Sequence, residues 1–244
     1  IAESVKNDLT QLREIIRLDE MMEMARADYE NGALDHALPE VKPDDIAQIQ
    51  YTSGTTGFPK GARLYHLGLV NNSRHAFIGS GFQEKSRYLT LWPLFHTAGC
   101  SASVLGGVQL RFTNYIMPMF IPDAVNTVIE TEQINITGGV PTMVIAMLEN
   151  YENNVRNFSS LRSFYSAGSM VSPELSRAVK KAWNFTPTVI YGQTEAHPVI
   201  TMTRTTDAEN ELYGTIGQPI EPRNTFTECS RRNLLPWLSS DAGI

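Results

Sequence analysis

The sequence predicts an α/β fold in which a mostly parallel sheet is covered by helices on both faces. Short runs rich in β-branched residues alternate with helical stretches between residues 46 and 191, as in chains that join parallel strands by crossover helices. Two polar segments, at residues 51–61 and 191–195, each follow directly on a strand-like run. Ligands of open α/β sheets bind beyond the carboxyl ends of the strands, so both segments are expected at a binding site.

The individual elements follow from the spacing of apolar residues. Apolar residues on one side of residues 122–132, and a compact apolar run at 141–148, predict two helices. A third helix has the clearest start, because Ser172 is a natural N-cap and Pro173 suits the first helical position. Around these helices, short β-branched or aromatic runs predict strands at 47–51, 62–64, 111–115, 134–137, 161–166 and 188–191.

The two ends of the chain differ from this alternating region. The pattern of residues 13–18 predicts a strand, followed by a methionine-rich helix, and residues 1–43 are expected to lead into the same large domain. Residues 44–220 form the predicted core of that domain. Beyond it the periodicity is lost, so residues 221–244 are predicted to be an aberrant, poorly ordered tail, as a truncation or a shifted reading frame would produce.

Composition excludes several classes of protein. Of the 244 residues, 42% are hydrophobic and 19% are charged, a balance typical of globular domains rather than disordered chains. The net charge of −6 predicts no nucleic-acid partner, and no apolar run is long enough to predict a transmembrane segment. Two cysteines are too few for a disulfide framework, which predicts a cytoplasmic protein. Because the chain opens at Ile1 rather than at methionine, it is expected to begin within a longer protein.

Residues 51–61 (YTSGTTGFPKG) form the strongest signal in the chain. A loop dense in glycine and hydroxyl residues can turn many backbone amides toward one anion, and Lys60 adds a positive charge suited to phosphate. It is not a Walker A loop, because Pro59 precedes the lysine where glycine is required and Gly61 follows it where Ser or Thr is required. Strand-like flanks on both sides predict a hairpin loop; the alternative is an ordinary flexible surface loop.

With this loop and the 191–195 segment in the same order, residues 44–219 resemble the adenylate-forming superfamily, which includes acyl-CoA synthetases, peptide-synthetase adenylation domains and luciferases. The resemblance implies the large N-terminal domain of that superfamily, incomplete at both ends. In the family the loop grips the β- and γ-phosphates of ATP. The residues that would do so here are Thr52, Ser53, Gly54, Thr55, Thr56, Gly57 and Lys60.

The segment Tyr191–Gly192–Gln193–Thr194–Glu195 matches the second family signature. By itself the pentapeptide is a weak signal, and Glu195 is then a solvated loop acid. The resemblance implies that Tyr191 covers the adenine, that Thr194 binds the α-phosphate and that Glu195 ligates Mg²⁺. It also implies that Gly168, Ser169 and Met170 border the adenine, although the family segment there is richer in glycine; the alternative is a plain strand-to-helix turn.

The segment around His96 indicates the class of substrate. Acyl-CoA synthetases carry a similar aromatic–His segment beside the acid, whereas amino-acid-activating domains carry an aspartate that pairs with the substrate ammonium. Since a histidine stands here, the resemblance implies a carboxylic acid without an α-amino group, such as a fatty acid, bounded by His96, Thr97, Gly139 and Val140. The alternative is a core histidine satisfied by the backbone.

The resemblance implies an AMP-forming acid–thiol ligase. ATP and Mg²⁺ activate the acid as an acyl adenylate, with Lys60, Thr194 and Glu195 as catalytic residues, and coenzyme A then accepts the acyl group. A fatty-acid substrate would imply peripheral contact with a membrane. The family's ribose-binding acid, hinge and late catalytic lysine are not found before Ile244, so this polypeptide is expected to turn over little by itself. Two alternatives remain: a non-catalytic ATP- or AMP-binding fragment, and an adenylating enzyme that loads a carrier protein.

Overall fold

The computed structural model describes residues 14–32, 39–52, 59–204, 206–212 and 214–220. The chain divides into two compact units, residues 1–41 and residues 42–244. The predicted tail at 221–244 lies outside the described residues. Within the described ranges, no helix is long and apolar enough to cross a membrane.

The described part of the first unit contains helix α2 (Leu18–Glu30), the methionine-rich helix that the sequence predicts. The strand predicted near residues 13–18 is wrong for residues 14–17, which have no regular secondary structure. The Glu20 carboxylate accepts a hydrogen bond from the Arg17 backbone N–H at 3.1 Å, so the local polar contacts start a helix instead of extending a strand.

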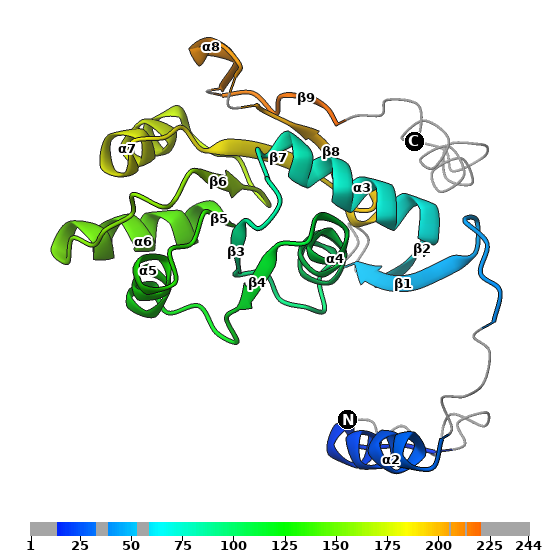
Figure 1. Cartoon of the computed structure of the whole chain (residues 1–244). Helices are drawn as coiled ribbons and strands as arrows, with labels where there is room; N and C mark the ends of the chain where they lie inside the picture. Colours follow the sequence, from blue (N-terminus) through cyan, green and yellow to red (C-terminus); the bar gives the residue numbers. More distant parts are fainter. Residues whose placement is uncertain (1–13, 33–38, 53–58, 205, 213, 221–244) are drawn as a thin grey trace, which may run out of the picture. The chain divides into compact units, whose positions relative to one another are not determined.

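The second unit is built on a seven-stranded sheet in the order β4-β3-β5-β6-β7-β8-β9 (Figure 1). The four strand pairs from β4 to β7 are parallel and the β7–β8 and β8–β9 pairs are antiparallel, which confirms the predicted mostly parallel sheet. The strands are β3 (Arg87–Thr90), β4 (Thr113–Ile116), β5 (Ile136–Gly139), β6 (Ser163–Ser166), β7 (Thr188–Gly192), β8 (Val199–Met202) and β9 (Gln218–Pro219).

Helices cover both faces of this sheet, as the sequence predicts (Figure 1). One face carries α5 (Pro122–Thr131), α6 (Pro141–Asn153) and α7 (Pro173–Trp183), and the other carries α3 (His66–Gly79), the π-helix η3 (Ala98–Leu105) and α4 (Gly106–Leu110). Successive strand residues point to opposite faces. Leu89 and Phe164 therefore join the first group of helices, whereas Tyr88 and Tyr165 join the second.

A hairpin precedes the sheet in the chain. Strands β1 (Ile46–Thr52) and β2 (Lys60–Tyr65) pair antiparallel, with Thr52 opposite Lys60, so the glycine-rich segment connects two strands as predicted. The short helices η4 (Thr194–Ala196) and α8 (Glu209–Leu212) complete the described elements.

Helix α6 continues to Asn153, five residues beyond the end predicted at Leu148. Tyr151 in this extra part lies with its ring centroid 5.0 Å from that of Phe158, and it also contacts Trp183 edge-on. The polar residues Glu149 and Asn150 interrupt the apolar run, but aromatic packing with residues distant in the sequence stabilises the additional turn.

The predicted N-cap of α7 is confirmed. The Ser172 hydroxyl accepts a hydrogen bond from the Leu175 backbone N–H at 3.2 Å. Replacing Ser172 by alanine is expected to lower the free energy of unfolding by about 1 kcal/mol, because one N–H of the first turn loses its acceptor. Urea denaturation measures this, with Ser159→Ala at an exposed position outside the helices as the control. Equal loss in both variants would contradict the capping role.

Candidate functional site

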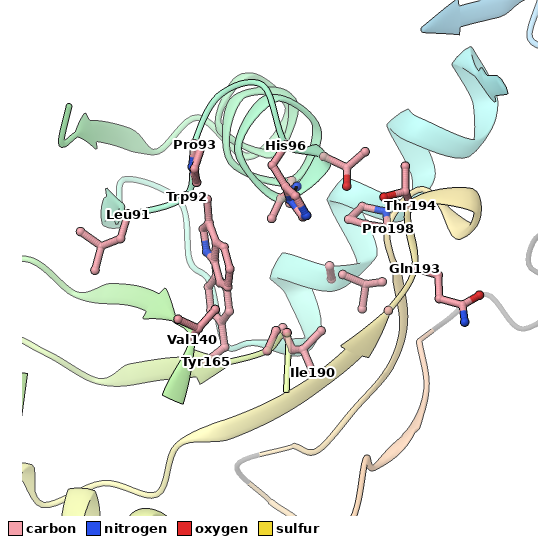
Figure 2. A pocket seen from close by; sticks show the side chains of 18 of the residues that line it. Leu91, Trp92, Pro93, His96, Val140, Tyr165, Ile190, Gln193, Thr194 and Pro198 are labelled. Atoms are coloured by element: carbon pink, nitrogen blue, oxygen red, sulfur yellow. Dashed lines mark hydrogen bonds between the residues drawn. The ribbon is translucent and has the colours of Figure 1, made fainter. Parts of the chain in front are cut away.

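A cavity of about 720 Å³ opens at the carboxyl ends of the parallel strands. Thr194 and Gln193 lie at one end and the rings of Trp92 and Tyr165 at the other, with His96 between them (Figure 2). Ten residues that the sequence singled out line it: Thr52, Lys60, His96, Thr97, Val140, Gly168, Gly192, Gln193, Thr194 and Glu195.

Other residues singled out by the sequence lie elsewhere. Gly139 is buried behind the cavity wall and does not line it. Ser169 and Met170 are exposed, Met170 to 91%, and neither lines the cavity. The Tyr191 ring is 39% exposed outside the lining and its hydroxyl accepts a hydrogen bond from the Gln193 amide at 3.1 Å. Ser53, Gly54, Thr55, Thr56 and Gly57 lie outside the described residues.

The hairpin carries two of the lining residues to the polar end. Thr52 ends β1 and Lys60 begins β2, and their pairing places both side chains at the base of the glycine-rich segment. The Thr52 hydroxyl lies 3.5 Å from the Lys60 carbonyl oxygen. Thr52 and Lys60 thus bring a hydroxyl and an ammonium group to the cavity side of the segment.

The residues that follow β7 fold back tightly on the start of β8. The Gln193 backbone N–H donates to the Pro198 carbonyl at 2.9 Å, and residues 194–196 form the 3-10 helix η4. Gly192 permits this reversal, because a Cβ atom there would lie 2.2 Å from the Pro198 carbonyl oxygen. The reversal brings the side chains of Thr194 and Glu195 to the cavity.

His197 is a residue whose role the sequence does not reveal; its pattern predicted only a surface or structural position. The side chain is 2% exposed, and its Nε2 accepts a hydrogen bond from the Tyr65 backbone N–H at 3.2 Å. A Cβ atom on Gly68 would lie 2.6 Å from the ring, so glycine is required opposite it. Burial lowers the pKa of His197 to about 4. The neutral ring therefore connects the end of the hairpin to the segment that carries Thr194 and Glu195.

Asn72 fixes the same segment from helix α3. Its amide group donates to the Ala196 carbonyl at 3.1 Å and to the Val199 carbonyl at 2.7 Å, and its oxygen accepts from the Val199 N–H at 3.0 Å. Asn72 shares the buried face of α3 with Leu69, Ser73, Ala76 and Phe77, and a polar residue spaced among apolar ones was the sequence signal that could have pointed to this contact.

The geometry of His96 determines its tautomer. Its Nδ1 accepts a hydrogen bond from the Ala98 N–H at 3.1 Å, so the neutral ring carries its proton on Nε2. Partial burial lowers the pKa of His96, which favours this neutral form. The ring stacks on Trp92 at a centroid distance of 6.5 Å and lies toward the cavity (Figure 2). His96 can therefore donate a hydrogen bond to an anion without adding a charge.

The π-helix η3 begins at Ala98, two residues after His96. π-Helical turns are rare and often occur at functional sites. Ala98 and Ala102 of this helix line the cavity, and Gly99 lies so close to the preceding turn that a Cβ atom would be 2.2 Å from the Pro93 carbonyl oxygen. The small residues of η3 let its backbone lie close to the cavity without filling the cavity with side chains.

Acidic metal ligands are few in the site. Among the described residues there is no group of three or more His, Cys, Asp or Glu side chains that could hold a metal ion, and Glu195 is the carboxylate that lines the cavity. A divalent cation here would take its remaining ligands from a phosphate group and water, as Mg²⁺ commonly does in nucleotide sites.

Most of this chain matches the model of one protein family. A family model described as AMP-binding enzyme matches residues 2–226. The chain belongs to this family. It is 34% identical over 185 residues to the mitochondrial medium-chain acyl-CoA ligase ACSF2 of Rattus norvegicus, covering 71% of this chain and 29% of the ligase. It is 32% identical over 168 residues to 4-coumarate–CoA ligase 1 of Arabidopsis thaliana, covering 67% and 30%.

The fold is similar to that of a solved structure. The ATP-bound crystal structure of MatB from Rhodopseudomonas palustris matches with a TM-score of 0.69 and 25% sequence identity, over 76% of this chain and 36% of MatB. The fold is thus that of the N-terminal domain of adenylate-forming enzymes. In each of these matches the AMP-binding chain spans about a third of the relative's length.

Proposed function

We propose that this AMP-binding chain carries the nucleotide and acid site of an acid–CoA ligase that activates a carboxylic acid lacking an α-amino group. The observation that supports this most is the division of one cavity into two ends. Thr194 and Gln193 lie at one end, which is suited to phosphates, and His96 stands between them and the aromatic end of Trp92 and Tyr165, which is suited to an acid (Figure 2). Lys60 and Glu195 line the same cavity.

At the polar end, different residues bind different parts of the nucleotide. Lys60, Thr52 and the hydroxyl residues of the glycine-rich segment hold the β- and γ-phosphates, and Thr194 holds the α-phosphate. Tyr191 and the 168–170 segment border the adenine. Because the Tyr191 ring and Met170 are exposed beside the cavity, their contact with adenine would cover apolar surface that is open to solvent.

At the other end, His96, Thr97 and Val140 surround the carboxylate and the first atoms of the acid, with Gly139 behind them. A substrate ammonium group would find no carboxylate partner there among the described lining residues. The Nε2–H of His96 donates to a carboxylate oxygen or to the phosphate that it attacks. This arrangement favours aliphatic or aryl acids over amino acids.

The proposed reaction has two steps. A carboxylate oxygen attacks the α-phosphorus of ATP, the bond to the bridging oxygen breaks, and pyrophosphate leaves. The thiol of coenzyme A then loses its proton to solvent and its sulfur attacks the acyl carbon. The bond from that carbon to the phosphate oxygen breaks, AMP departs and a thioester remains. The residues of this chain contribute by positioning the reactants and by balancing phosphate charge with donors and Lys60.

Mg²⁺ is the proposed metal, with Glu195 as its protein ligand. When bound it would neutralise phosphate charge. Glu195 follows Thr194 directly, so a cation held by its carboxylate would lie beside the phosphate that Thr194 binds.

Replacing Lys60 by alanine is expected to weaken binding of Mg·ATP to the 244-residue chain by about ten- to a hundredfold, since a charge-assisted contact to phosphate is lost. Isothermal titration calorimetry measures the affinity. Lys181→Ala, an exposed lysine of α7 outside the cavity lining, is the matched control. ATP affinity that is the same in both variants would argue against the proposed phosphate site.

The acceptor is tested with the longer protein to which this chain corresponds. Acid-dependent release of AMP, followed by thioester formation, is measured with coenzyme A and with a phosphopantetheine-bearing carrier protein. The proposal expects the thioester with coenzyme A. Transfer to the carrier protein alone would assign the chain to an enzyme that loads carrier proteins.

A further inference from the structure

Two stacked side chains, Trp92 and Tyr165, line the apolar end of the cavity, and we call them the aromatic wall (Figure 2). Their ring centroids are 6.2 Å apart and the rings are nearly parallel, at 9°. Tyr88 lies behind the wall, fully buried and stacked on Tyr165 at 6.2 Å. Trp92 follows β3 and Tyr165 lies in β6, and β5, which pairs with both strands, lies between them.

The polar atoms of this wall form a single chain of hydrogen bonds with a fixed direction. The Ser103 hydroxyl donates to the Ala98 carbonyl at 2.9 Å, so it must accept from the Tyr88 hydroxyl, 3.2 Å away. Tyr88 therefore accepts from the Tyr165 hydroxyl, and Tyr165 accepts from the Trp92 indole N–H at 3.2 Å. Each hydroxyl has one proton to give, so every donor in the chain is used within the protein.

Burial keeps these protons in place. It raises the pKa of Tyr88 to about 12 and raises that of Tyr165 well above its ordinary value. At neutral pH both tyrosines therefore keep their protons, and the direction of the hydrogen bonds stays fixed.

The other groups that the structure describes near the wall offer no free hydrogen-bond donor to a ligand. Phe77, Met143 and Ile190 are apolar, and the Ser80 hydroxyl donates to the Ala76 carbonyl at 2.9 Å. The buried Thr97 hydroxyl has no partner among the described residues, but Thr97 directly follows His96 and so belongs to the carboxylate side. A polar group on the far part of an acid would lose its water and find no donor at the wall.

We propose that Trp92 and Tyr165 are specificity-determining residues that select acids with an unsubstituted, apolar tail over acids whose tail carries a hydroxyl group. This inference rests on the proposed function, because it requires the acid to extend from His96 toward the wall. The unsubstituted acid is expected to bind about ten- to a hundredfold more tightly, since a buried hydroxyl without a partner is unfavourable but its small volume is tolerated.

The test uses acyl sulfamoyladenosines, hydrolysis-resistant mimics of the acyl adenylate, with the 244-residue chain. Two matched pairs differ by one hydroxyl: cinnamoyl against 4-hydroxycinnamoyl, and octanoyl against 8-hydroxyoctanoyl. Calorimetry gives the affinity of each and of sulfamoyladenosine without an acyl group. In both pairs the unsubstituted compound is expected to bind more tightly than its hydroxylated partner and more tightly than sulfamoyladenosine.

Tyr165→Phe provides the variant that tests the hydrogen-bond chain. It keeps the ring but removes the acceptor of the Trp92 N–H, which then becomes available to a ligand. The preference for the unsubstituted compound is expected to fall to less than about threefold. Trp92→Phe, which frees a lone pair of the Tyr165 hydroxyl, is expected to act in the same direction. Met143→Leu changes the same end of the cavity without touching the chain, so the ratio within each pair should stay as in the wild type.

The outcomes separate this inference from the function on which it rests. Equal affinities within both pairs, or a preference that survives in both Tyr165→Phe and Trp92→Phe, would overturn the role of the wall. Binding of sulfamoyladenosine that no acyl group improves would also overturn it, while leaving the nucleotide site intact. If sulfamoyladenosine itself does not bind, the proposed function fails as well.

Discussion

Replacing Gly192 by alanine is expected to weaken ATP binding by more than tenfold and to lower the free energy of unfolding by about 1–3 kcal/mol. The added Cβ atom would lie 2.2 Å from the Pro198 carbonyl oxygen and 3.0 Å from its carbon. Both neighbours are backbone atoms, so the chain reversal after β7 must open. Thr194 and Glu195 would then leave their positions in the cavity.

Gly139→Ala is the matched control for this prediction. Gly139 ends β5, which β6 separates from β7 in the same sheet, but its added Cβ atom would meet Met143 at 3.4 Å, an ordinary van der Waals contact. Calorimetry with ATP and urea denaturation are applied to both variants. Retention of wild-type ATP affinity by Gly192→Ala would show that the reversal does not position the nucleotide site.

The stability of this AMP-binding chain is expected to fall by about 2 kcal/mol between pH 7 and pH 5 because of His197 alone. Burial lowers the pKa of this side chain from 6.5 to about 4 in the folded protein. Between those two values the unfolded chain binds the proton and the folded chain does not. The stabilisation is therefore present above pH 6.5 and is lost as the pH falls toward 4.

His197→Asn isolates this contribution. Asparagine does not titrate, offers an oxygen acceptor toward the Tyr65 N–H and tolerates the positive φ of 78° at this position. The variant is expected to be less stable at pH 7 but to lose about 2 kcal/mol less than the wild type between pH 7 and pH 5. His96 contributes with the same sign to both proteins and cancels in the difference. Identical pH dependence in both proteins would contradict the buried, neutral state of His197.

Local signals were sufficient for several elements of the fold. The N-cap at Ser172 and the apolar spacing of α5 predicted their helices within one or two residues, because caps and one-sided burial leave a mark in the nearby sequence. Strand β3 was missed. It has four residues, and its sides are buried in different clusters, so it shows neither length nor alternation. Its place between β4 and β5 depends on pairing with residues far away in the chain.

The same distinction applies to the site. The residue types of the glycine-rich segment and of residues 191–195 suggested phosphate chemistry by themselves, and their nucleotide roles remain predictions. Trp92 and Tyr165 gave no such signal. An isolated tryptophan or tyrosine in an apolar run is compatible with any core. Only the sheet order β3-β5-β6 brings these two side chains together as a wall.

By itself, the sequence determined the alternation of strands and helices, the family and the chemical character of the two polar segments, because each depends on residues within a few positions of one another. Only the tertiary structure decided that His197 is buried between the hairpin and the 191–195 segment, that the hydrogen bonds of Trp92 and Tyr165 run inward, and that η3 adopts a π-helix beside them. These features arise from contacts between distant residues, and the free energy of burial depends on such contacts rather than on local sequence.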